Sequence, residues 1–318
     1  MRKVLRANSY FLLILLMEIF IPIPLVFIYK ILNITDTRIM LFMNHTIIFI
    51  VPAIIYLIVT KQSAKEVLRL NKLHFKDMLL IILLAFMCQP IMMFFSLISQ
   101  FLFENEIGNF ITSISSTPYI LLLLLVAVMP AITEEITLRG VVLAGYEEKN
   151  MYISSAIIGL FFGIFHLDAQ QFLYATVLGF ILALVVRITN SIFSSVIMHF
   201  LINGTSITMQ KILMAFSSDE ELIQQATETS IGELPADAKI IMFIFYSAIA
   251  IAFGIVVYFI IRKLKEINTL RGTLKSENNY RTMISEKKDP VFNIPFFATI
   301  IIYLVYMFLP NILMLIIK

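Results

Sequence analysis

The sequence predicts an all-α protein, a polytopic bundle of about eight or nine transmembrane helices. Hydrophobic residues make up 60% of the 318 positions and charged residues only 14%, whereas a soluble domain has about 25% charged residues. Apolar runs near the ~20 residues needed to cross a bilayer recur along the whole chain. These runs are too long for strands and show no apolar/polar alternation, so β-structure is not expected.

Nine segments are expected to cross the membrane. The first is too long for a secretory signal peptide and lacks a small-residue cleavage site, so we expect it to remain as an anchor. The fifth and sixth are short, and the turn around Asp168 between them is tight, which is typical of helices that surround a water-filled cavity. The segments are residues 9–32, 39–60, 77–103, 118–146, 151–167, 170–187, 191–214, 239–261 and 292–317.

Lysine and arginine predict the orientation, because cytoplasmic loops carry an excess of both. They cluster before the first span, after the second and after the eighth, which nine spans place on one side. Loops 104–117 and 216–238, on the other side, contain neither residue. We therefore expect a cytoplasmic N-terminus and an external C-terminus. The basic residues are Arg2, Lys3 and Arg6, then Lys61, Lys65, Arg69, Lys72 and Lys76, then Arg262, Lys263, Lys265, Arg271, Lys275, Arg281, Lys287 and Lys288, and the acidic residues of loop 216–238 are Asp219, Glu220, Glu221, Glu228, Glu233 and Asp237.

Composition also bounds the location and the partners. A chain rich in isoleucine and lysine and free of tryptophan favours an AT-rich bacterial genome, so a bacterial plasma membrane is expected. The lipid bilayer is the expected contact of the basic loops, and no nucleic-acid partner is expected. The single cysteine, Cys88, lies in an apolar run and excludes both an intramolecular disulfide framework and a multi-cysteine metal site.

Polar side chains deep in the spans concentrate in the fourth to seventh segments. A charge at the centre of a span costs about 3 kcal/mol on insertion scales, so such residues need a use or a partner. Glu18, in the first span, either faces a neighbouring helix or is tolerated near the interface. His45 and His74 are expected outside the cluster. The cluster comprises Glu134, Glu135 and Arg139 in ITEEITLRG, His166 in FFGIFHLD, and His199 and Asn203 in IMHFLING.

Spacing assigns different surroundings to the two adjacent acids. Glu135 and Arg139 are four residues apart and share a helix face, which allows an internal ion pair. Glu134 lies about 100° round the helix at 3.6 residues per turn, so it is left free for chemistry. The same offset of four places the Phe162 ring beside His166 and directs His199 and Asn203 into one cavity.

Two forms of peptide hydrolysis fit this set of residues. A carboxylate and an imidazole can hold and deprotonate a water, while a second imidazole and an amide donate hydrogen bonds to an oxyanion. Alternatively, Glu134, His166 and His199 could supply three ligands to a catalytic zinc, although there is no H-E-x-x-H helix. A pair of Ser195 with His199 is poorly placed for in-line attack on one helix.

The three motifs, in this order on successive membrane helices, resemble the CPBP intramembrane proteases, which include type II CAAX prenyl endopeptidases and bacterial proteins linked to bacteriocin processing or self-immunity. The resemblance covers roughly residues 118–210, through E-E-x-x-x-R, F-x-x-x-H and H-x-x-x-N. It implies that Glu134 and His166 activate the water and that His199 and Asn203 stabilise the oxyanion. It also implies that Glu135 and Arg139 organise the site. Both metallo- and metal-free glutamate mechanisms are argued for this family.

The resemblance also suggests a division of the chain and a class of substrate. We expect N-terminal transmembrane helices at 1–110, a catalytic core at 118–214, and an acidic external loop with C-terminal helices at 215–318. The substrate would be a membrane protein or peptide, such as a peptide pheromone or a bacteriocin. The metal-free mechanism requires no cofactor, and zinc remains the alternative. Other functions stay open: a catalytically idle immunity or scaffold protein, or a proton-coupled transporter that uses the same residues.

Overall fold

The computed structural model describes residues 2–103, 114, 116–216, 231, 234–274 and 289–317, without the side chains of residues 214 and 309–317. Within these residues every regular element is a helix, which confirms the all-α prediction. The helices are α1 (Lys3–Phe20), α2 (Pro22–Ile31), α3 (Thr37–His45), η1 (Thr46–Ile50), α4 (Val51–Thr60), α5 (Ala64–Val67), α6 (Phe75–Gln100), α8 (Tyr119–Leu123), η2 (Leu124–Val128), α9 (Met129–Glu135), η3 (Ile136–Val142), α10 (Met151–Phe165), α11 (Ala169–Thr189), α12 (Ile192–Phe216), α14 (Ala236–Leu270) and α16 (Ile294–Ile317), where η marks π-helical turns.

All nine predicted spans correspond to helices, but length and composition alone assign fewer crossings. Six described helices are long and apolar enough to span a membrane, or seven if α1 and α2 form one broken span. That pair is bent by 45° where prolines at 22 and 24 follow α1, because a proline cannot donate to the preceding turn. The two remaining predicted spans are the shorter apolar helix α10 and the described part of α16.

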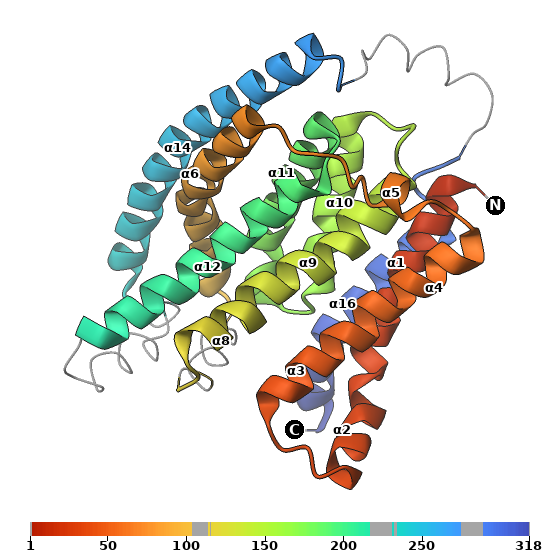
Figure 1. The fold of residues 1–318 in the computed structure, drawn as a ribbon. Helices are drawn as coiled ribbons and strands as arrows, with labels where there is room; N and C mark the ends of the chain where they lie inside the picture. The colour runs from red at the N-terminus through yellow and green to blue at the C-terminus, as the bar shows by residue number, and fades with distance from the viewer. Residues whose placement is uncertain are drawn as a thin grey trace.

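The helices form one packed bundle (Figure 1). In it α14 lies beside α6, α16 lies beside α1, and α9 to α12 lie between these two sides. Helices from all three predicted segments pack against one another, since α6 contacts α11, α12 and α14. The bundle therefore surrounds the motif-bearing helices with the flanking ones.

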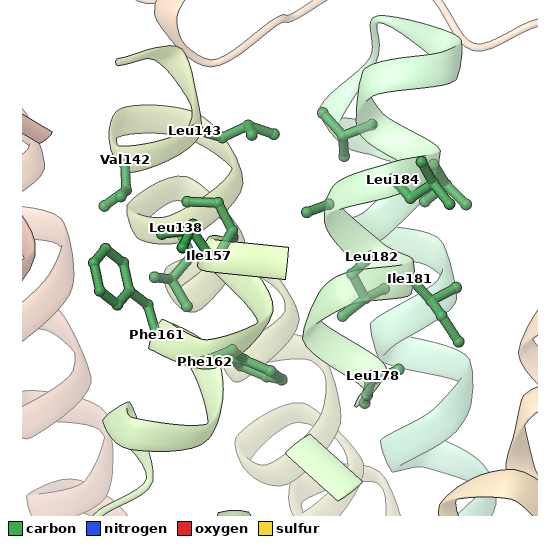
Figure 2. Packing of buried hydrophobic residues seen from close by; sticks show 14 of the residues in the cluster. Leu138, Val142, Leu143, Ile157, Phe161, Phe162, Leu178, Ile181, Leu182 and Leu184 are labelled. Carbon is green, nitrogen blue, oxygen red and sulfur yellow. The ribbon is translucent and has the colours of Figure 1, made fainter. Parts of the chain in front are cut away.

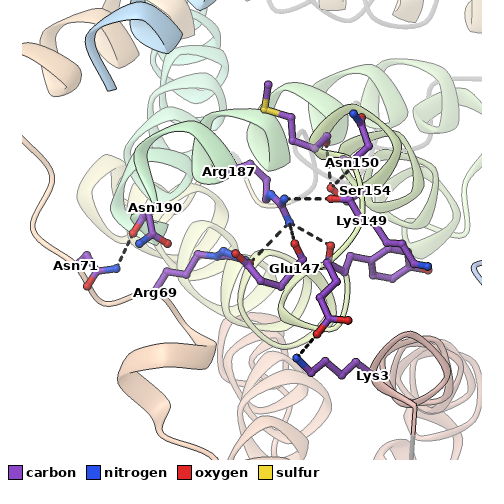
Figure 3. A network of polar contacts seen from close by, with 12 residues as sticks. Lys3, Arg69, Asn71, Glu147, Lys149, Asn150, Ser154, Arg187 and Asn190 are labelled. Atoms are coloured by element: carbon purple, nitrogen blue, oxygen red, sulfur yellow. Dashed lines mark hydrogen bonds and ion pairs between the residues drawn. The ribbon is translucent and has the colours of Figure 1, made fainter. Parts of the chain in front are cut away.

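Described members of the three predicted basic clusters make polar contacts with neighbouring parts of the chain. Lys3 of α1 pairs with Glu148 at 2.6 Å, and Arg69, after α5, pairs with Glu147. Arg187, near the end of α11, donates to the carbonyl groups of the turn after η3 (Figure 3). Arg271, after α14, pairs with Asp77 of α6 at 2.5 Å. The predicted acidic residues Asp219, Glu220, Glu221, Glu228 and Glu233, and the basic residues Lys275, Arg281, Lys287 and Lys288, lie outside the described residues.

Glycines allow α10 and α11 to approach closely. A Cβ atom on Gly159 of α10 would lie 2.6 Å from the carbonyl oxygen of Thr176, and one on Gly179 of α11 would lie 2.9 Å from the Gly159 Cα atom. Small residues at such crossings let helix backbones pack in direct contact. Figure 2 shows the apolar side chains of both helices around this crossing, with Phe162 on the side that faces α11. This contact fixes the end of α10, where His166 stands.

Candidate active site

A cavity of about 740 Å³ lies among the motif-bearing helices. Its walls come from α1, α3, η1, α6, η2, α9, α10, α11, α12 and α14. The four residues to which the sequence analysis assigns catalysis all line it, which confirms that they converge: Glu134, His166, His199 and Asn203.

Glu135 and Arg139 form the ion pair that their spacing predicts. Arg139 Nη1 lies 2.9 Å from Glu135 Oε1, and both side chains are 0% exposed. Arg139 Nη2 also donates to the carbonyl oxygen of Gly179, at 3.2 Å, which ties η3 to α11. The guanidinium lies 4.4 Å from the centre of the Phe162 ring, a cation–π contact. Phe162 therefore joins the buried ion pair to the histidines, since its ring also meets His166 and His199 edge-on, at 4.7 and 5.7 Å.

His199 stands between the two acids. Its Nδ1 atom lies 2.9 Å from Glu135 Oε1, and its Nε2 atom lies 3.9 Å from Glu134 Oε2. A carboxylate paired with arginine can only accept a hydrogen bond, so His199 Nδ1 carries a proton and donates a hydrogen bond to Glu135. The spacing of the motifs gave no sign of this bond, because Glu135 and His199 are 64 positions apart. Glu135 therefore orients the imidazole as well as neutralising Arg139.

His166 directs one ring nitrogen away from its own helix. It follows the last residue of α10, and its Nδ1 atom lies 2.7 Å from the carbonyl oxygen of Phe162. Because a carbonyl only accepts, Nδ1 carries the proton and Nε2 is the acceptor in the neutral ring. Glu134, at 8% exposure, leaves its Oε2 atom without a hydrogen-bond partner among the described residues. No hydrogen bond joins Glu134 to His166, so the two face the cavity as separate groups.

Asn203 is held by a carbonyl group that a proline sets free. Pro130 of α9 has no N–H, so the carbonyl of Val126, four residues earlier, loses its helical partner. Asn203 Nδ2 donates to this carbonyl at 3.2 Å. The π-helical turn η2 lies directly before α9, just as η1 precedes Pro52 of α4. One amide proton of Asn203 is thus used for positioning, and the other remains available to the cavity.

Two residues outside the motifs also reach the cavity: Glu18 of α1 and His45 of α3. The sequence analysis expected His45 outside the cluster, and its place in the cavity wall corrects that expectation. His45 Nδ1 lies 3.0 Å from Thr133 Oγ1, next to Glu134 in the chain. The Thr133 hydroxyl donates its hydrogen bond to the Met129 carbonyl, at 3.0 Å, so His45 Nδ1 is the donor in its bond with Thr133. No sequence signal marked this contact, because it depends on how α3 packs on α9.

A zinc site and a Ser195–His199 pair are the two alternatives to the water-activating site. Among the described residues, no group of three or more His, Cys, Asp or Glu side chains is arranged to hold a metal ion, so Glu134, His166 and His199 share a cavity without forming a ligand set. Ser195 donates its hydroxyl to the Ile192 carbonyl at 3.0 Å, while His199 Nδ1 faces Glu135. Ser195 and His199 therefore do not form a nucleophile–base pair here.

Residues 115–205 match the family model described as type II CAAX prenyl endopeptidase Rce1-like. The match falls on the segment whose motifs resemble the CPBP proteases. The match contains every motif residue from Glu134 to Asn203 and leaves the flanking helices unmatched. Neither the curated proteins nor the solved structures contain a match to the chain. The match supports, in general terms, an intramembrane endopeptidase, and the long apolar helices support a multi-pass membrane protein.

Proposed function

We propose that this protein is an intramembrane endopeptidase that hydrolyses a peptide bond of a membrane-associated protein or peptide, with water as the nucleophile. The observation that carries the proposal is the meeting of Glu134, His166, His199 and Asn203 in one cavity, inside the segment that matches the family. The substrate would approach through the membrane. The lysine and arginine distribution supports a cytoplasmic N-terminus, and the overall composition favours a bacterial cell.

Glu134 and His166 activate the water. Glu134 Oε2 has no hydrogen-bond partner among the described residues, and the proton on His166 Nδ1 leaves Nε2 as an acceptor. A water held between these groups attacks the carbonyl carbon of the scissile bond and gives its proton to Glu134 or His166. The same group then passes that proton to the leaving amine as the C–N bond breaks. A carboxylic acid and an amine result, with no other reactant consumed.

His199 and Asn203 stabilise the oxyanion of the tetrahedral intermediate. Asn203 contributes the amide proton that Val126 does not take. His199 donates through Nε2, which requires both ring nitrogens to carry protons, because Nδ1 already donates to Glu135. An imidazolium fits the local charges, since Glu134 and Glu135 are then balanced by Arg139 and His199. Fixed donors of this kind act strongly where charge develops in the transition state.

The metal-free form of the mechanism fits the described geometry better than the zinc form. A zinc bound by Glu134, His166 and His199 would take away the water-activating groups and leave Asn203 as the only oxyanion donor. The described side chains are not grouped as a ligand set, and Asn203 on the same helix face as His199 suits a second oxyanion donor better than a zinc ligand. We therefore prefer the mechanism that requires no cofactor, with zinc as the alternative.

The decisive experiment compares purified wild-type protein with the Glu134→Ala variant. Both are reconstituted in lipid nanodiscs and incubated with a library of membrane-inserting peptides, and the products are identified by mass spectrometry. We expect cleavage by the wild-type protein alone. Absence of cleavage by wild type, with the fold intact, would favour a catalytically idle immunity or scaffold protein. Equal cleavage by both proteins would remove Glu134 from the mechanism.

A further inference from the structure

Glu18 is a second carboxylate in the cavity wall, and the mechanism does not use it. It projects from α1, outside the segment that matches the family. It lines the same cavity as Glu134. Its Oε2 atom is buried without a hydrogen-bond partner in the described part of the chain. A buried carboxylate in this position is costly unless a cation or a donor compensates it.

The described cavity wall supplies no permanently charged side chain that is free to pair with Glu18. No lysine or arginine side chain lines the cavity, and Arg139 is already paired with Glu135. His45 Nδ1 donates to Thr133 and His166 Nδ1 donates to the Phe162 carbonyl. The two ring nitrogens of His199 face Glu135 and Glu134. A basic group that enters the cavity can therefore supply the compensating charge.

Two glutamines in the same wall point to a peptide occupant. Gln170 of α11 is 1% exposed, and its Oε1 atom has no hydrogen-bond partner, while Nε2 donates to Ser96 at 2.9 Å. Gln89 of α6 has an unpartnered Nε2 atom. The wall thus offers a buried acceptor and a buried donor among the described residues. A peptide group, with one N–H and one C=O, satisfies both, whereas a lone metal cation or ammonium ion cannot.

We propose that the cavity selects peptides with a basic side chain close to the scissile bond, and that Glu18 binds the ammonium or guanidinium group. This inference rests on the proposed function for the position of the scissile bond, which is set by Glu134. The basic group neutralises a carboxylate that the described wall leaves without a permanently charged partner. Gln89 and Gln170 hold the peptide backbone beside it. Glu18 is therefore a specificity-determining residue and takes no part in proton transfer.

Binding tests the inference without requiring cleavage. The probes are two short fluorescent apolar peptides that are acetylated and amidated, one with a central lysine and one with norleucine at that position. We expect the wild-type protein to bind the lysine peptide roughly 10- to 100-fold more tightly, the range for a hydrogen bond to a charged group. Glu18→Gln should remove most of this preference, and Glu18→Lys should reverse it towards a peptide with central glutamate.

Control variants separate charge recognition from folding. Glu66→Gln makes the same chemical change at an exposed carboxylate outside the cavity and should keep the preference. Glu18→Asp should keep part of it, with thermal unfolding checked for every variant. Equal binding of both peptides by wild type, binding of neither, or an unchanged preference in Glu18→Gln would overturn the inference. Cleavage without a lysine preference would support the proposed function and contradict this inference. A lysine preference without cleavage would support this inference and contradict the proposed function.

Discussion

His199 donates its Nδ1 proton to Glu135 at 2.9 Å, so the acid that neutralises Arg139 also orients the imidazole of the site. The oxygen involved, Oε1, is the same one that Arg139 contacts at 2.9 Å. One buried carboxylate oxygen therefore links η3 to α12. Glu134, one residue earlier, faces the cavity. The two adjacent acids have different neighbours, and they should respond differently to the same substitution.

Glu135→Gln should lower stability and activity together. The substitution leaves Arg139 buried without its counter-charge, which costs roughly 3–5 kcal/mol, and it weakens the orientation of His199. Glu134→Gln should abolish hydrolysis and leave thermal unfolding near wild type, because the only charged group near Glu134 Oε2 in the described residues is His199 Nε2, at a long 3.9 Å. Unfolding temperature in detergent and single-turnover cleavage measure the two effects. Loss of activity in both variants with no change in stability would mean that the ion pair is not structural.

The contrast between these acids shows what local spacing predicts. Glu135 and Arg139 are four residues apart, so helix geometry alone brought them together. The bond from His199 to Glu135 depends on how α12 packs against α9, which no local pattern encodes. Likewise, Glu18 and His45 reach the cavity because α1 packs against η3 and α3 packs against α9. Both residues stand alone in apolar runs, without a motif to mark them.

Two prolines explain local helix geometry that the spacing of the motifs does not predict. Pro130 and Pro52 each remove a helical hydrogen bond, and a π-helical turn precedes each of them. The carbonyl of Val126 that Pro130 sets free positions Asn203. The spans themselves were predictable because hydrophobic length is a strong constraint in a bilayer. The bend between α1 and α2 was not recognised, although prolines at 22 and 24 mark it.

Asn203→Ala should lower kcat by roughly 10²–10³, the usual effect of removing one oxyanion donor. KM should change little, since the donor acts mainly on the charge of the transition state. Gln210→Ala provides the control, because Gln210 lines the cavity from the same helix without a part in the proposed chemistry. Steady-state kinetics on one peptide measure both variants. A change in KM alone for Asn203→Ala would make Asn203 a substrate-binding group instead.

Gly159→Ala should destabilise the protein and reduce kcat. The added methyl would lie 2.6 Å from the Thr176 carbonyl oxygen and 2.7 Å from the Phe180 nitrogen, so α10 must move and carry His166 with it. Overpacking of this kind costs roughly 1–3 kcal/mol. Gly254→Ala is the matched control, because nothing lies within 4 Å of its added methyl. Equal unfolding temperatures for the two variants would contradict the close helix contact.

Cysteine labelling should confirm the orientation. Leu102→Cys, at the end opposite the basic residues, should react with an impermeant maleimide on intact cells, whereas Lys65→Cys should react only after lysis. Both positions are exposed, and the native Cys88 is buried. Positions 110, 225 and 275 test the same prediction but lie outside the described residues. Labelling of Lys65→Cys from outside would invert the assignment that lysine and arginine support.

Hydrolysis should survive exhaustive removal of metal ions. A catalytic zinc takes three protein ligands and keeps one open position, and in this cavity the ligands would have to be Glu134, His166 and His199. His199 Nδ1 is committed to Glu135, and Asn203, a poor zinc ligand beside histidine and carboxylate, lies one turn away on the same helix. This arrangement suits two donors to one oxyanion better than a ligand set. Activity should therefore be unchanged after dialysis against a strong chelator, with metal content followed by mass spectrometry. Loss of activity that stoichiometric zinc restores, with about one zinc bound per chain, would make His199 a ligand and replace the metal-free mechanism.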